Sequence, residues 1–145
     1  MKTYNEVIAA ANVTIKNVSN NLRDGNKEFT SISSVLKFMQ QKQFMKYYSD
    51  VFVACGVPVG AKITPKQFFD VTVDEQWGQT LNKKGEVVGE AWVGIWGKRQ
   101  VVIDGVKQFE DDGVTPIVED VLRKVTAWTP TKVFRVLAQA QAFKA

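Results

Sequence analysis

Apolar residues recur at spacings of three and four at both ends of the chain, which is the pattern of helices that bury one face. The first stripe predicts a helix that ends in the turn at residues 24–26, and the second predicts one long helix over residues 31–54. Gly56 and Pro58 are expected to stop the second helix. The first stripe consists of Ile8, Ala11, Ile15, Val18 and Leu22.

Three Thr-Pro pairs each precede an amphipathic segment, at Thr64, Thr115 and Thr129. Threonine is favoured as an N-cap and proline at the first helical position. The pairs therefore predict a short helix from residue 65, a penultimate helix from residue 116 and a last helix from residue 130. The expected inward residues of the last two helices are Val118, Val121, Leu122, Val125, Val133, Val136, Leu137 and Ala140.

The pattern changes to strands near Thr80, because turn signals now separate short β-branched runs. Residues 82–85 predict a turn, and the pairs at 97–98 and 104–105 predict two-residue hairpins. The expected strands cover about 86–96, 99–103 and 106–110. The fold class predicted is α+β: an antiparallel meander of three to five strands, roughly over 71–110, packed by N-terminal and C-terminal helices. We expect one domain over 1–145, helical over 1–56, mainly β over 57–112 and helical over 113–145.

The segment EAWVGIWGKRQ, residues 90–100, is the best candidate for a site. Alternation along a strand places Trp92, Gly94 and Trp96 on one face. The two hairpins would pair Trp96 with Arg99, Arg99 with Glu110, and Trp92 with Ile103. Two interpretations stay open: the indoles are core beneath a helix that packs on Gly94, or they are an exposed platform for flat ligands.

The composition excludes several chemistries. The chain has no histidine and one cysteine, so standard zinc sites and His-dependent nucleophiles cannot be built. Cys55 lies in an apolar run and is expected to be a buried small residue. Phosphate-binding glycine loops are absent, and the EDDG run lacks the ligand spacing of a calcium loop. We expect no catalytic residue, no metal, no cofactor and no enzymatic activity.

Charge is distributed unevenly along the 145 residues, although the net charge is only +4. Residues 104–122 hold six acids and one lysine, and residues 123–145 hold five basic residues and no acid. A basic surface beside tryptophans is suited to phosphates and bases. The residues expected to bind nucleic acid are Trp92, Trp96, Lys98, Arg99, Lys83, Lys84, Arg123, Lys124, Lys132 and Arg135.

The function predicted is therefore a non-catalytic binding protein that contacts a polyanion such as single-stranded nucleic acid. The expected partners are nucleic acid or an acidic protein surface. The alternative is a self-assembling structural or protein-interaction subunit, such as a viral or phage component or an inhibitor, and a homo-oligomer. Its contact anchors would be Tyr47, Tyr48 and Phe52. With no signal peptide or apolar membrane span in the sequence, we expect a soluble intracellular protein and no membrane partner.

Overall fold

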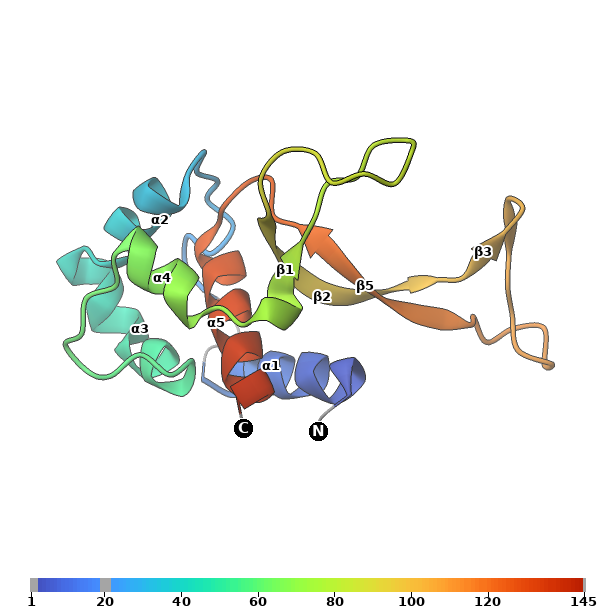
Figure 1. The fold of residues 1–145 in the computed structure, drawn as a ribbon. Helices are drawn as coiled ribbons and strands as arrows, with labels where there is room; N and C mark the ends of the chain where they lie inside the picture. The colour runs from blue at the N-terminus through green and yellow to red at the C-terminus, as the bar shows by residue number, and fades with distance from the viewer. Residues whose placement is uncertain (1–2, 19–21, 145) are drawn as a thin grey trace.

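The computed structural model describes residues 3–18 and 22–144, and it divides into a helical body and a projecting arm (Figure 1). The predicted fold class, α+β with antiparallel strands and helices at both ends, is confirmed. The body contains α1 (Tyr4–Val18), α2 (Ile32–Met39), α3 (Lys42–Ala54), α4 (Pro65–Val71), the short 3-10 helix η1 (Asp74–Gln76) and α5 (Pro130–Lys144). The first helix was expected to end in a turn at residues 24–26, and residues 23–26 do form a turn. Residues 19–21, just before it, lie outside the described residues.

The core is centred on α5, which is buried along most of its length. Phe134 is fully buried, with its ring against Phe44 and Phe52 of α3. Val7 and Ala11 bury the inner face of α1. Helix α5 therefore connects the helices of the body, and the strands attach to the same helix.

Two of the three predicted Thr-Pro helix starts are confirmed. The Thr64 hydroxyl accepts a hydrogen bond from the Gln67 N–H, and the Gln67 side chain accepts one from the Thr64 N–H, which is a capping box. The Thr129 hydroxyl accepts from the N–H of Lys132 at the start of α5.

The predicted single helix over 31–54 is wrong, because the chain forms α2 and α3 with a break at residues 40 and 41. Met39 and Phe44, both buried, are five residues apart, so one straight helix could not bury them on one face. The break is fixed by the Gln40 side chain, which donates to the carbonyl of Ile63 and accepts from its N–H. Ser31 caps α2 through its hydroxyl group.

The strands form two small sheets. The first has the order β1 (Trp77–Gly78), β2 (Trp92–Gln100), β5 (Val118–Lys124), and the second pairs β3 (Val102–Ile103) with β4 (Val106–Lys107). The predicted turn at Asp104 and Gly105 is confirmed, with φ values of 50° and 79°. The turn at 82–85 is also confirmed: the Asn82 side chain accepts from the N–H groups of Lys84 and Glu86.

The predicted hairpin at residues 97–98 is wrong. Strand β2 continues through Gly97, which pairs with Val121 of β5 and does not have the positive φ that a glycine-first hairpin needs. The register predicted across that hairpin is therefore also wrong, whereas the hairpin at 104–105 pairs Ile103 with Val106 as predicted. Trp96 pairs with Leu122, Trp92 with Gly78, and Arg99 with Glu119.

The helix predicted from Thr115 is wrong as well, because residues 118–124 form β5. Thr115 does not cap a helix, and its hydroxyl donates instead to the Asp112 carboxylate at 2.5 Å. Val118, Val121 and Leu122 are spaced as on one face of a helix, which favoured the helix prediction. The segment nevertheless forms a strand, because it pairs with β2 outside the body. Among the described residues, no helix combines the length and apolar character needed to cross a bilayer.

Candidate functional site

The arm, defined here as residues 97–121, is attached to the body through Trp96. The Trp96 ring stacks on Tyr4 of α1 at 3.9 Å between centroids, and its Nε1–H donates to the Glu75 carbonyl. Its backbone is held by Gln139 of α5, whose Oε1 accepts from the Trp96 N–H at 3.1 Å and whose Nε2 donates to the Trp96 carbonyl at 3.0 Å. The direction of the arm is thereby tied to α5.

Close contacts at two glycines set the base of the sheet. A Cβ at Gly94 would lie 2.7 Å from Leu122 Cδ1 and 2.9 Å from the Arg123 carbonyl oxygen, so only glycine fits beside β5. The Trp92 ring lies over Gly78, where a Cβ would be 2.3 Å from the ring. Both predicted site tryptophans are therefore half-buried and packed against the chain, which agrees with the core interpretation more than with an open platform.

The arm tip, defined as residues 101–117, is ordered by its own backbone hydrogen bonds. The Val101 N–H donates to the Ile117 carbonyl, the Ile117 N–H to Gln108, and the Gln108 N–H to Val101. The Glu110 N–H donates to the Thr115 carbonyl at 2.8 Å. Three passes of the chain are thus joined into one small unit at the far end of the arm.

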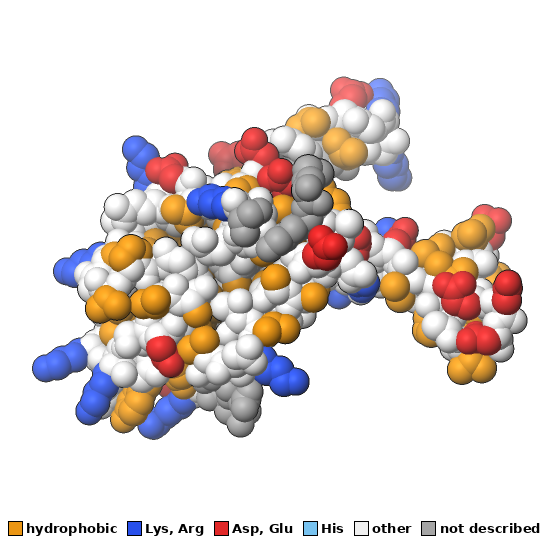
Figure 2. All heavy atoms as spheres, turned by 90° about the horizontal axis from the view of Figure 1, so that it is seen from below, with side chains coloured by type: hydrophobic (Ala, Val, Ile, Leu, Met, Phe, Trp, Pro, Cys, Tyr) orange, Lys and Arg blue, Asp and Glu red, His pale blue; other side chains and the backbone are white. Residues whose placement is uncertain are grey.

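The arm tip exposes apolar side chains among acids. Val114 is 76% exposed and Phe109 45% exposed. The acids are Asp104, Glu110, Asp111 and Asp112, and Lys107 is the one basic residue of the tip. Figure 2 shows the tip as a separate lobe where acidic and apolar side chains gather, while Lys and Arg side chains stand around the margin of the body. The other exposed apolar residues of the tip are Val102, Ile103 and Val106.

The arm contributes nothing to the core of the body. Among the described residues, those of the core and those packed against it include Ile95 and Val125 but none between these two positions. A domain of this size gains its stability by burying apolar side chains. The apolar residues of the tip are therefore not accounted for by the folding of this chain alone.

Asp112 organises the turn at the end of the tip. Its carboxylate accepts from the Thr115 hydroxyl and from the N–H groups of Thr115 and Val114. These hydrogen bonds, that of the Thr115 hydroxyl first, hold the pKa of the Asp112 carboxyl below its usual range. The acid most tightly bound within the tip is thus structural, and Glu110 and Asp111 remain for contacts outside it.

The predicted basic residues do not form one patch. Lys98 and Arg99 of β2 lie across from β5, where the Arg123 guanidinium donates to the Lys98 carbonyl. Arg99 forms an ion pair with Glu119 at 2.8 Å, not with Glu110. The others are distributed as follows: Lys83 and Lys84 at the turn of the 79–91 loop, Lys124 at the end of β5, and Lys132 and Arg135 on α5.

Of the predicted interaction anchors, only Tyr47 presents its ring to solvent. Tyr48 and Phe52 are buried in the core. The Tyr48 hydroxyl accepts a hydrogen bond from the Arg23 N–H, so its polar end is also used within the chain. Phe52 and Tyr48 are therefore structural residues in this fold.

A shallow hollow at the base of the arm brings three tryptophans together. Trp77, Trp92 and Trp128 line it with Phe69, and its volume is about 320 Å³. Glu90 is its one acidic lining residue. Sequence reasoning paired Trp92 with Trp96 and missed this group, because residues 77 and 128 are brought to β2 only by the tertiary fold.

Comparison of the chain with family models, with curated proteins and with solved structures found no match. The function must therefore be argued from the arm, the hollow and the surface of the body. Sequence reasoning noticed the acidic charge of residues 104–122 but not that the same segment exposes its apolar side chains. The sequence does contain a sign of this exposed surface. Acidic residues alternate irregularly with Val102, Ile103, Val106 and Phe109, and the spacing does not place these apolar residues on one face of a helix or strand.

Proposed function

We propose that this protein is a non-catalytic assembly subunit that associates with further copies of itself through its arm. The single observation that supports this function is the ordered arm tip, which exposes five apolar side chains and packs none of them on the body. Apolar side chains clustered on a projection, with polar groups around them, are typical of protein-binding surfaces.

The internal order of the tip favours binding over disorder. A segment that is already held by backbone hydrogen bonds loses little conformational freedom when it docks. The tip has such bonds, including those from the Gly113 N–H to the Glu110 carbonyl and from the Glu110 N–H to the Thr115 carbonyl. An arm of this kind reaches a neighbouring subunit without rearrangement of the body.

Sedimentation velocity over a range of concentrations tests this function. We expect the wild-type protein to associate as concentration rises and the double variant Phe109→Ser, Val114→Ser to remain monomeric. Leu81→Ser is the matched control, since Leu81 is an exposed apolar residue, 56% exposed, on the other projecting loop. A wild-type protein that stays monomeric at high concentration would overturn the proposal.

We propose a polyanion, single-stranded nucleic acid in particular, as a second candidate ligand. The observation that favours it is the hollow of three tryptophans, which Val125 also lines; the residue before it in the chain, Lys124, is exposed. Base stacking on an aromatic ring contributes about 1–3 kcal/mol per base. Trp92→Ala should then weaken binding of a labelled oligonucleotide by that amount, and no binding at low ionic strength would exclude this candidate.

A further inference from the structure

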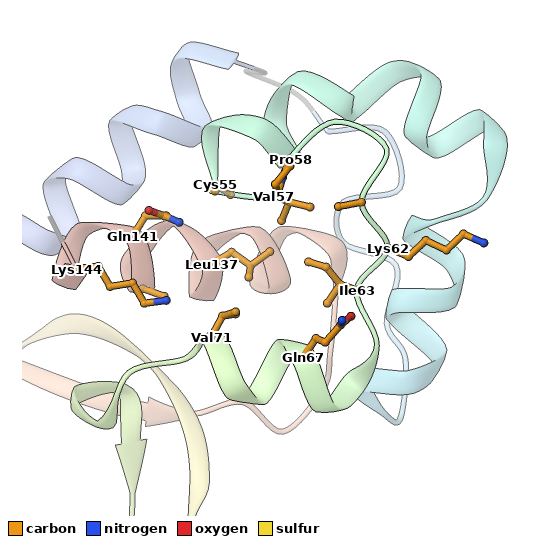
Figure 3. A pocket seen from close by; sticks show the side chains of 13 residues that line it. Cys55, Val57, Pro58, Lys62, Ile63, Gln67, Val71, Leu137, Gln141 and Lys144 are labelled. Carbon is orange, nitrogen blue, oxygen red and sulfur yellow. The ribbon is translucent and has the colours of Figure 1, made fainter.

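A cavity on the body lies between the segment that follows α3, helix α4 and helix α5 (Figure 3). Its volume is about 310 Å³. An apolar cavity of about 150 Å³ is enough to hold a benzene ring. The space therefore admits one phenyl side chain together with part of the chain that carries it. The apolar lining residues include Val57, Pro58, Ile63, Val71, Leu137 and Ala140.

The charged residues of this cavity are both basic. Lys62 and Lys144 line it, and among the described residues no acidic side chain does so. Figure 3 shows Lys144 extending beneath α5 on the side of Val71, and Lys62 pointing outward from the rim. Val59, on the same segment, is 83% exposed. An apolar site lined by two lysines, of which Lys144 extends beneath α5 and Lys62 turns its ammonium group outward, is positively charged and suits an aromatic side chain followed by carboxylates.

The arm tip carries that combination. Phe109 is followed directly by Glu110 and Asp111, and none of the three is buried. The arm extends away from the side of the body where the segment between α3 and α4 lies (Figure 1). The tip therefore points away from the cavity of its own molecule, so a contact between tip and cavity would join two molecules.

We infer that the cavity receives Phe109 from the arm tip of a second copy, with Glu110 and Asp111 facing Lys62 and Lys144. This inference rests on the proposed function and assigns the surface to which the arm binds. The two surfaces differ, so the contact is head-to-tail. Such a contact leaves a free arm and a free cavity at the ends of every open complex, so it generates open filaments, or rings where the two ends meet, instead of closed two-fold dimers.

Charge reversal on each side tests the assignment in the full-length protein. The cavity variant is Lys62→Glu, Lys144→Glu, and the arm variant is Glu110→Lys, Asp111→Lys, which leaves Asp112 in its turn. Lys37→Glu, Lys46→Glu is the matched control, with the same charge change on exposed positions of α2 and α3. Melting temperatures near that of the wild type show that each variant folds.

We expect each variant alone to associate about tenfold or more weakly than the wild type, because like charges then face each other. An equimolar mixture of the two should recover association, since each arm again meets a cavity of opposite charge. The control should associate like the wild type. Salt should weaken association of the wild type and of the mixture.

The outcomes separate the two proposals. If the serine variant of the arm abolishes association but the cavity variant associates like the wild type, the arm binds elsewhere and the cavity assignment is wrong. A mixture that stays as weak as its components would overturn it too. If the wild type itself is monomeric, the proposed function fails first. A small aliphatic carboxylate that fills the cavity should compete with the arm of a second copy. If it saturates the cavity and association is unchanged, the second copy is not the occupant.

Discussion

At the scale of single residues, close approach explains more of the structure than charge does. Gly94 and Gly97 lie three residues apart on β2, yet only Gly94 has neighbours where a Cβ would be placed. Cys55 is 2% exposed, and its thiol donates to the Phe134 carbonyl. These positions give two predictions that need no knowledge of the partner.

We expect Gly94→Ala to lower the free energy of unfolding by about 1–3 kcal/mol, the usual loss when a well-packed site is overfilled. The added Cβ would press on Leu122 and on the backbone of Arg123, which cannot move without breaking the β2–β5 pairing. Gly97→Ala is the control, because its Cβ meets nothing within 4 Å and its φ is not positive. Equal denaturation midpoints for the two variants would contradict the register.

We expect Cys55 to be inert in the folded protein. Burial raises the pKa of the Cys55 thiol from 9.0 to about 12, so the reactive thiolate is scarce at any neutral or mildly basic pH. Reaction with a disulfide reagent at pH 8 should be slow in buffer and fast in denaturant. Rapid labelling of the native protein would show that the structure around Cys55 opens and exposes its thiol.

At the scale of elements, the position and shape of the arm depend on the hydrogen bonds of two polar side chains. The Gln139 side chain holds both backbone groups of Trp96, and the Asp112 carboxylate closes the turn of the tip. The first fixes the arm to α5, and the second shapes the surface that we propose for binding.

We expect Gln139→Ala to destabilise the protein by about 1–3 kcal/mol, because the N–H and carbonyl of Trp96 lose their partners in a partly buried site. Gln141→Ala on the same helix is exposed and should be near neutral. Urea denaturation of both variants measures the difference. Similar midpoints would mean that the amide contact adds nothing to stability.

We expect the turn at the end of the tip to weaken in acid. The folded-state pKa of Asp112 lies below its usual range, so its contribution to stability is complete above the unfolded-state pKa, about 3.9 for aspartate, and is lost as pH falls through the folded value. The amide resonances of Val114 and Thr115 should shift with a midpoint below 3.9. Asp112→Asn should abolish that step, and a midpoint at or above 3.9 would contradict the hydrogen bonds.

Local signals predicted the elements of the body better than those of the arm. Thr64 and Thr129 start helices because the following residues bury a helical face in the body. Thr115 has the same local sequence, but its segment finds a strand partner in β2 instead. Gly97 resembled a turn for the same reason, since a glycine fits a hairpin and a straight strand equally well. The candidate site depended on that register and could not be placed without the pairing of β5.

At the scale of the whole molecule, the charge is divided between two parts. The arm tip, residues 101–117, has four acids and one lysine and carries a net charge of −3, so the remainder of the chain carries +7, because the whole has +4. Opposite net charges on the arm tip and on the remainder of the chain favour the contact between copies that we propose, and within one molecule the arm extends away from the body (Figure 1).

The last prediction separates the folding of the body from the function of the arm. Residues 98–120 are replaced by Asn-Gly, which joins Gly97 to Val121, a pair that is adjacent in the sheet. Since no described core residue lies between Ile95 and Val125, we expect the shortened protein to unfold cooperatively within about 4 °C of the wild type. It should also be monomeric at concentrations where the wild type associates. Loss of cooperative unfolding would mean that the arm is needed for the fold, and unchanged association would show that the subunits meet through another surface.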